Sequence, residues 1–388
     1  MTRFNPLIQS IAVSDIRQFD SEVSTIPDII KLTLGEPDFN TPDHIKAAAI
    51  RAIQDNQSHY TPNAGLGLLR QATADYYREK FDLDYQADQV VTTVGATEAI
   101  QATIQTLFEP GDVLLVPTPV FPIYMPDALI NHGQIVTIDT SADHFVLTPE
   151  KLRQTIADHA DKTIKALVLV YPSNPTGVTY SKEQLTALSQ VIKEAGLWVI
   201  CDEIYAELTY DQQHFSLAKL LPDQAVVITG LSKSHAMTGW RIGYIMGPQP
   251  FIEQVVKSHQ YMVTSPATIS QYAALAAMTA GQGDAAIMRQ AYKERRDFLK
   301  AALEACGFEV APADGAFYLF AKIPASCPQD AWTFVRDLTQ KAKVALIPGD
   351  SFGPGGQSYV RLSYAAAMAD LEEAARRIQA YVASQGKA

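Results

Sequence analysis

Short apolar runs of strand length alternate with longer segments of helical periodicity through most of this chain. When a helix connects two strands, the second strand returns in the same direction, and helices then cover both faces of the sheet. The alternation therefore predicts an α/β fold whose large domain has a mostly parallel seven-stranded sheet flanked by helices. We expect strands at residues 90–93, 113–116, 134–138, 166–171, 198–201, 226–229 and 244–246, and helices at 97–108 and 181–195.

After residue 251 the pattern changes to helices followed by short strands, which is typical of a smaller α+β domain. The chain of 388 residues is also too long for one simple core. We expect helices at 284–306 and 370–382, and strands at 317–320, 344–347 and 359–362. The predicted division is 1–44 as an N-terminal arm and part of the small domain, 45–285 as the large domain and 286–388 as the small C-terminal domain. The arm could pack on the small domain or on a partner subunit.

The composition is that of an ordinary soluble globular protein, with 47% hydrophobic and 19% charged residues. No apolar run approaches the ~20 residues that span a bilayer, and the first residues lack the apolar core of a secretory signal. We therefore expect a cytoplasmic protein that binds no membrane. The net charge of −11, without a basic run, argues against nucleic-acid binding. Three cysteines without CxxC spacing and eight scattered histidines predict neither a disulfide framework nor a metal site.

Lys233 is the residue with the most specific chemical setting, because it follows the predicted strand at 226–229 in a turn of small hydroxyl residues. A lysine amine can form a Schiff base with an aldehyde cofactor. If that cofactor carries a phosphate, Ser232 can donate to it and Arg241 can bind it with two parallel hydrogen bonds. A lysine beside a strand is, on its own, more often a solvated rim residue. The residues at the other strand ends therefore decide whether Lys233 is a cofactor-binding lysine.

The strand end at residue 93 leads into Gly95, Ala96 and Thr97. A glycine turn that opens a helix allows close backbone approach, and the amides of Ala96 and Thr97 can meet an anion there. The alternative is an ordinary turn with Thr97 as the helix N-cap. The next strand ends in a proline-rich loop, in which Phe121 could stack on a planar ring or simply pack.

Two further strand ends carry polar side chains that suit a pyridine ring. Asn174 lies between prolines that exclude helix and central strand, so it can donate to a phenolate oxygen, or the segment is simply a tight turn. Asp202 ends a buried strand and needs a positive partner, which a protonated pyridine nitrogen supplies. Tyr205 could be a second phenolate donor. Together with Lys233, these strand ends predict pyridoxal 5′-phosphate as the cofactor.

The chain resembles the class I/II aminotransferases, fold-type I pyridoxal-phosphate enzymes, over essentially its whole length. Within them it is most similar to the aromatic amino-acid aminotransferases of lactic acid bacteria and the N-acetyl-LL-diaminopimelate aminotransferases of Gram-positive bacteria. The segments that carry the resemblance are 34–39, 58–61, 171–179, 230–243 and 359–364. One departure is Gly230, where many relatives have a second serine that contacts the phosphate.

The resemblance implies a role for each candidate. Lys233 would bond to the cofactor aldehyde, Asp202 would pair with the ring nitrogen, and Asn174 and Tyr205 would contact the ring hydroxyl. The substrate α-carboxylate would meet Arg361, with Gly35 and Asn174 beside it, although the sequence alone would favour a strand-edge salt bridge for Arg361. The implied cofactor contacts also include Gly95, Ala96, Thr97, Phe121, Ser232, Arg241 and, from the neighbouring subunit of a homodimer, Tyr60.

The expected reaction moves an amino group from an aromatic or other large apolar L-amino acid to a 2-oxo acid such as 2-oxoglutarate. Some aspartate-using relatives have a lysine at the position of Thr97, and its absence disfavours a dicarboxylic donor. The alternatives are an N-acetyl-LL-2,6-diaminopimelate aminotransferase of lysine biosynthesis, a carbon-sulfur β-lyase, and a ligand-sensing regulator. The regulator would need a DNA-binding module, which the acidic charge disfavours.

Overall fold

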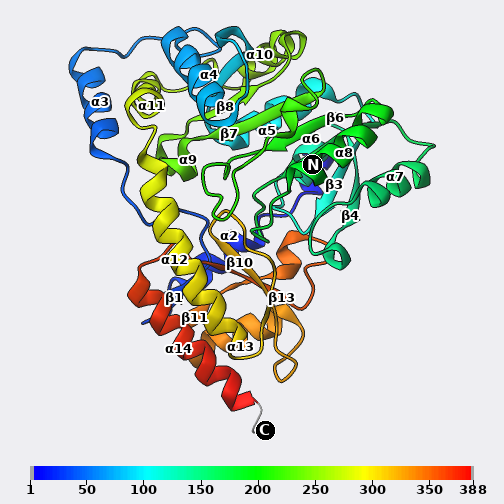
Figure 1. The fold of residues 1–388 in the computed structure, drawn as a ribbon, viewed down its shortest axis with the longest axis vertical. Coiled ribbons are helices and arrows are strands. Elements are labelled where there is room, and N and C mark those ends of the chain that lie inside the picture. The colour runs from blue at the N-terminus through cyan, green and yellow to red at the C-terminus, as the bar shows by residue number, and fades with distance from the viewer. Residues whose placement is uncertain (1–3, 386–388) are drawn as a thin grey trace.

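The computed structural model describes residues 4–385, and its main feature is a seven-stranded sheet of order β2-β8-β7-β6-β5-β3-β4 (Figure 1). Only β8 runs against its neighbours β2 and β7, so the mostly parallel sheet is confirmed. Every predicted strand of this sheet is present, with ends shifted by at most two residues. The strands are β2 (Val90–Thr93), β3 (Val113–Thr118), β4 (Gln134–Asp139), β5 (Ile164–Val170), β6 (Trp198–Asp202), β7 (Ala225–Gly230) and β8 (Gly243–Met246).

Helices cover both faces of this sheet because successive strand residues point to opposite sides. In β7, for example, Val226 and Ile228 pack with helices α5 (Gly95–Leu107) and α10 (Gln249–Val263). Val227 points the other way, toward α4 (Gly67–Phe81), α8 (Lys182–Ala195) and α11 (Thr268–Ala280). Both faces are therefore buried, which explains the continuous apolar runs in the sequence.

The starts of two helices test the sequence analysis in different ways. The predicted helix at 181–195 begins one residue later, because Ser181 is the N-cap of α8 and accepts from the amide of Gln184. By contrast, Thr97 is not an N-cap, because α5 already begins at Gly95 and Val94 is the capping residue. Thr97 thus lies in the first helical turn, where its amide has no partner within the helix.

The remaining helices lie before, between and after the strands of the large sheet in the sequence. The other helices are α1 (Pro6–Gln9), α2 (Asp15–Val23), α3 (Asp43–Gln54), α6 (Tyr124–Ile130), α7 (Pro149–Asp158), α9 (Leu231–Ser234), α12 (Asp284–Glu304), α13 (Ala331–Ala342) and α14 (Met368–Gln385). Short 3-10 helices are η1 (Ala87–Gln89), η2 (Ser141–Asp143), η3 (Leu217–Lys219), η4 (Thr238–Trp240) and η5 (Gly349–Phe352). Among residues 4–385 no helix is both long and apolar enough to cross a membrane.

A second sheet has the order β12-β13-β10-β9 and lies beside the C-terminal half of α12 (Figure 1). Its strands are β9 (Glu309–Val310), β10 (Tyr318–Lys322), β12 (Ile347–Pro348) and β13 (Tyr359–Ser363). Apolar residues of α2 share one core with α12, α13 and α14.

The predicted single strand at 344–347 is wrong in one respect. It is divided into β11 (Val344–Ala345), which pairs with β1 (Ile30–Lys31), and β12, which belongs to the second sheet. The amides of Ile30 and Leu32 donate to the carbonyls of Lys343 and Ala345. The first half of the segment 344–347 therefore pairs with a strand more than 300 residues away in the sequence. Local periodicity cannot reveal such a partner.

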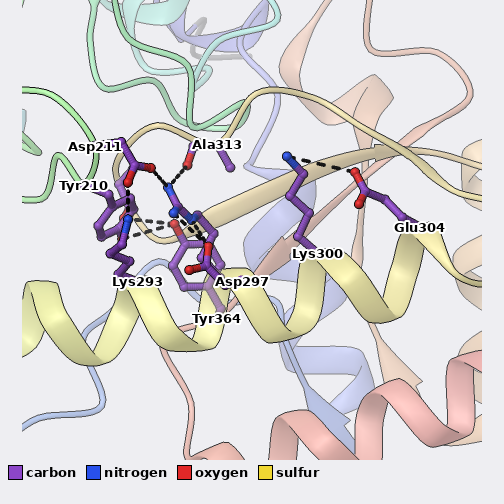
Figure 2. Close-up of polar contacts among 10 residues, drawn as sticks. Tyr210, Asp211, Lys293, Asp297, Lys300, Glu304, Ala313 and Tyr364 are labelled. Carbon is purple, nitrogen blue, oxygen red and sulfur yellow. Dashed lines mark hydrogen bonds and ion pairs between the residues drawn. The ribbon is translucent and has the colours of Figure 1, made fainter.

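Polar contacts fasten α12 to the loop that follows β6 (Figure 2). Asp211 of that loop accepts from Lys293 and, at 2.8 Å, from Nη1 of Arg296 on α12. The same nitrogen donates to the carbonyl of Ala313 at 3.1 Å, and Tyr364 Oη donates to Tyr210 Oη at 3.1 Å. These contacts fix the segment before β10 against the loop after β6, which carries Tyr205.

Candidate active site

Lys233 lies in α9, directly after β7, and its Nζ donates to the carbonyl of Gly35 at 2.6 Å. Burial lowers the pKa of this ammonium to about 8, and the charges of Arg241 and Arg361 act in the same direction. Glu36 and Asp202 oppose the shift. A lysine with this pKa has a substantial neutral fraction in mildly alkaline solution and can then act as a nucleophile.

Asp202 ends β6 as a buried carboxylate with two protein donors. Tyr124 Oη donates to Oδ2 at 2.6 Å, and the amide of Ile204 donates to Oδ1 at 3.1 Å. Burial raises the pKa of the Asp202 carboxyl, while these hydrogen bonds limit the rise. Sequence reasoning missed Tyr124, although it belongs to the same strand-end segment as Phe121. Both hydrogen-bond donors that the described residues supply to this buried carboxylate are neutral, so it suits a cationic ligand atom.

Tyr205 meets a second residue that the sequence analysis missed as part of the site, Tyr318 of β10. Their hydroxyls lie 2.8 Å apart. Burial raises the pKa of Tyr205 well above its ordinary value, so its hydroxyl stays protonated. A β-carbon on Gly35 would collide with the Tyr318 hydroxyl, which explains why glycine occupies that position.

Arg361 of β13 is buried at 2% exposure, yet its hydrogen-bond partners are neutral. Nη1 donates to Oδ1 of Asn174 at 2.9 Å, and Nη2 donates to the carbonyl of Thr33. Within residues 4–385, Nε has no hydrogen-bond partner. Its Cζ lies 4.5 Å from the ring centre of Tyr318 and 5.0 Å from that of Phe352. The strand-edge salt bridge is therefore wrong. A buried cation that lacks a carboxylate partner fits an anionic ligand.

An anion-binding cradle forms where three segments meet. Gly95 has a φ of +78° and its missing side chain leaves room for the guanidinium of Arg241, with which a β-carbon would collide. The first turn of α5 presents the free amides of Ala96 and Thr97 beside it. Buried Ser232 of α9 precedes Lys233 directly. These residues fit a phosphate group.

Two predicted residues stand apart from the buried groups. Phe121 is 37% exposed, and its amide donates to the carbonyl of Asn174 at 2.8 Å, so its loop lies beside the site. Tyr60 is 89% exposed on the loop between α3 and α4. Its hydroxyl therefore has no role in the buried site unless another surface covers it.

A buried amine, a buried carboxylate and a cradle that fits a phosphate lie at adjoining strand ends, and this set of groups suits an enzyme that uses a phosphorylated pyridine aldehyde. Comparisons with known proteins agree with this class. The family model described as "Aminotransferase class I and II" matches residues 27–378. The probable N-acetyl-LL-diaminopimelate aminotransferase of Bacillus subtilis (strain 168) is 44% identical over 99% of this chain and 97% of that protein.

Two solved structures are also similar. The aspartate aminotransferase from Thermus thermophilus with maleate has a TM-score of 0.93 and 34% identity, and the match covers 98% of this chain and 100% of that one. The aromatic aminotransferase from Pyrococcus horikoshii OT3 has a TM-score of 0.88 and 33% identity, with 94% and 99% covered. This chain belongs to the class I and II aminotransferase family. It is a pyridoxal 5′-phosphate-dependent transaminase of fold type I.

Proposed function

We propose that this transaminase takes the amino group of an aromatic or other large apolar L-amino acid and passes it to a 2-oxo acid such as 2-oxoglutarate. The observation that carries the substrate class is the lining near Arg361. Phe352 packs on Arg361, Leu34 precedes Gly35 and is 36% exposed, and Phe121 adjoins Asn174. Thr97, exposed at the start of α5, adds no charge for a distal carboxylate.

Each site residue has a role in this proposal. When bound, pyridoxal 5′-phosphate supplies an aldehyde that bonds to amines and a ring that withdraws electrons from the adjacent carbon. Lys233 holds the cofactor at rest and, once free, moves a proton to and from the substrate α-carbon with Nζ. Asp202 keeps a proton on the ring nitrogen, while Tyr205 and the amide nitrogen of Asn174 donate to the ring hydroxyl.

The remaining roles concern binding. Arg361 and the Gly35 backbone orient the α-carboxylate, Phe121 stacks on the ring, and Ser232 and Arg241 hold the phosphate together with the first turn of α5. We also propose a cytoplasmic homodimer in which Tyr60 completes the phosphate site of the neighbouring subunit. The predicted division at residues 44 and 285 into an arm, a large domain and a small domain is part of this proposal.

A second candidate is N-acetyl-LL-2,6-diaminopimelate as the amino donor. This candidate is favoured by the Bacillus subtilis relative, which is 44% identical to this chain and is named a probable N-acetyl-LL-diaminopimelate aminotransferase. This donor also has an α-carboxylate for Arg361, so only the distal part of the pocket would distinguish it from an aromatic amino acid.

The test is an absorbance titration of the purified holoenzyme with L-phenylalanine, without an acceptor. The proposal expects conversion of the lysine-bound cofactor to its amine form, reversed by 2-oxoglutarate. An unchanged spectrum with phenylalanine but conversion with N-acetyl-LL-2,6-diaminopimelate would overturn the aromatic assignment. In Lys233→Ala, turnover should fall by at least ~10²–10⁴-fold because general acid–base assistance is lost, and full retention would overturn the role of Lys233.

A further inference from the structure

The Tyr60 loop, residues 55–66, is exposed at its tip but firmly held at its base. Gln271 of α11 is fully buried and accepts from the amide of Leu66 at 2.8 Å. The same side chain donates to Oγ1 of Thr61 at 2.9 Å. Thr268 Oγ1 donates to the carbonyl of His59 at 2.7 Å. An exposed aromatic residue on a fixed loop is preorganised for contact with another surface, because little further ordering is required.

His259 of α10 links this loop to the phosphate cradle. The ring is fully buried, and Nε2 lies 2.8 Å from the carbonyl oxygen of Asn63 in the Tyr60 loop. On the other side, Nδ1 lies 3.0 Å from Oε1 of Glu98, in the first turn of α5. Oε2 of Glu98 accepts from the amide of Val94 at 2.9 Å. One side chain therefore bridges the loop and the start of α5.

The donors in this bridge follow from the acceptors. A backbone carbonyl can only accept, so Nε2 of His259 carries a hydrogen and donates to Asn63. Nδ1 and the carboxyl of Glu98 share a second hydrogen bond. Nδ1 thus contacts α5 and Nε2 contacts the Tyr60 loop, so the imidazole fixes the distance between α5 and this loop.

We propose that His259 is a positioning residue that ties the cofactor phosphate sites of the two subunits together. This inference rests on the proposed function, in which α5 serves the phosphate of its own subunit and Tyr60 serves that of the neighbour. The hydrogen bond between His259 and Glu98, called the Glu98 arm, then positions the cradle in the same subunit. The hydrogen bond between His259 and Asn63, called the Asn63 arm, positions the loop that reaches across the interface.

Two substitutions cut one arm each. The shorter amide of His259→Asn can reach the Nδ1 position and keep the contact with Glu98, but it loses Asn63. The longer amide of His259→Gln can reach the Nε2 position and keep Asn63, but it loses Glu98. The hydrogen bonds of Gln271 remain in both variants, so the loop keeps a second attachment.

Mixed dimers separate effects within a subunit from effects across the interface. One chain carries Lys233→Ala, so only its partner can bond covalently to the cofactor. The cofactor is removed, and pyridoxal 5′-phosphate is titrated back while the absorbance of the lysine-bound form is followed. We expect His259→Asn to weaken binding about tenfold, equivalent to about 1.4 kcal/mol, when it is on the Lys233→Ala chain. On the chain that retains Lys233 it should have little effect.

His259→Gln should show the opposite dependence on which chain carries it. Glu98→Ala removes the same arm from the less buried side and should reproduce that result even if substitution of His259 prevents folding. Ser258→Ala is the matched control, since it loses a hydrogen bond to Gln105 from the same helix and should leave affinity unchanged. Unchanged affinity in the arm-cutting variants, or equal effects in both arrangements, would overturn the proposal.

Tyr60→Phe in the same mixed dimers tests the underlying function separately. If Tyr60→Phe weakens cofactor binding only on the chain that retains Lys233, the assignment of Tyr60 to the neighbouring subunit fails. If Tyr60→Phe acts across the interface and His259→Asn does not, the assignment of Tyr60 stands and the role of His259 is wrong.

Discussion

Tyr124 donates a 2.6 Å hydrogen bond to Oδ2 of Asp202, from the first residue of α6 to the last residue of β6. Both side chains are buried, so no water replaces this donor at low cost. Tyr124 therefore stabilises the ionised form of the carboxylate that faces the ring nitrogen in the proposed function.

Tyr124→Phe should lower kcat roughly tenfold, because a hydrogen bond to a charged group contributes about 1.5–3 kcal/mol. The loss raises the pKa of the Asp202 carboxyl further and weakens its hold on the ring proton. The measurement is kcat together with the absorbance of the bound cofactor. Tyr381→Phe is the matched control, since Tyr381 donates a 2.7 Å hydrogen bond to Asp337 between α14 and α13. Equal effects of the two variants would contradict a role for Tyr124 in the site.

The pKa of Lys233 predicts a pH dependence for covalent capture of the cofactor. Burial lowers this pKa to about 8, so the reactive neutral amine increases as pH rises toward 8 and is the main form above it. The capture rate of pyridoxal by the cofactor-free protein should rise about tenfold per unit below this pH and level off above it. Stopped-flow absorbance measures the rate. A rate that continues to rise up to pH ~10, the range of an ordinary lysine, would show that the amine is not perturbed.

Arg361→Lys should raise KM for the amino donor and for the 2-oxo acid by roughly 10- to 100-fold. Lysine keeps the charge but cannot bind a carboxylate through two parallel hydrogen bonds, and it loses the contact with Asn174. Steady-state kinetics in both directions measure the effect. Arg336→Lys serves as the control, because Arg336 also stacks on an aromatic ring, that of Trp332, in α13. An unchanged KM for both substrates would exclude Arg361 from carboxylate binding.

Thr97→Lys should shift the preference toward dicarboxylic donors. The new ammonium at the start of α5 would supply a counter-ion for a distal carboxylate, whereas an aromatic side chain gains nothing from it. We expect the ratio of kcat/KM for L-aspartate to that for L-phenylalanine to rise about tenfold, equivalent to about 1.4 kcal/mol. Thr97→Ser controls for the loss of threonine. If the ratio stays constant in Thr97→Lys, Thr97 does not face the substrate side chain.

Gly35→Ala should destabilise the protein by about 1–3 kcal/mol, the usual cost of overpacking. The new methyl group would collide with the hydroxyl of Tyr318. Tyr318→Phe removes that hydroxyl, so Gly35→Ala combined with Tyr318→Phe should regain much of the loss. Denaturant unfolding of the single and double variants measures the coupling. Additive losses in the double variant would contradict the steric explanation.

The strands of the large sheet and the helices predicted at 97–108 and 181–195 could be predicted because their buried faces leave a local period in the sequence. The candidates at the strand ends followed from topology, since parallel strands present their carboxyl ends along one edge. Lys233, Asp202 and Asn174 each follow a buried apolar run, so their proximity required no knowledge of side-chain directions.

Contacts between distant segments were decided only by the tertiary structure. The run at 344–347 divides because β1 captures its first half. Tyr124, Tyr318 and His259 join the site or its support through hydrogen bonds to residues 78, 113 and 161 positions away. Periodicity records whether a side chain is buried, but not which distant polar atom it meets. The sequence therefore determined the sheet and the chemical type of the site, whereas packing between segments decided the partners of each polar group.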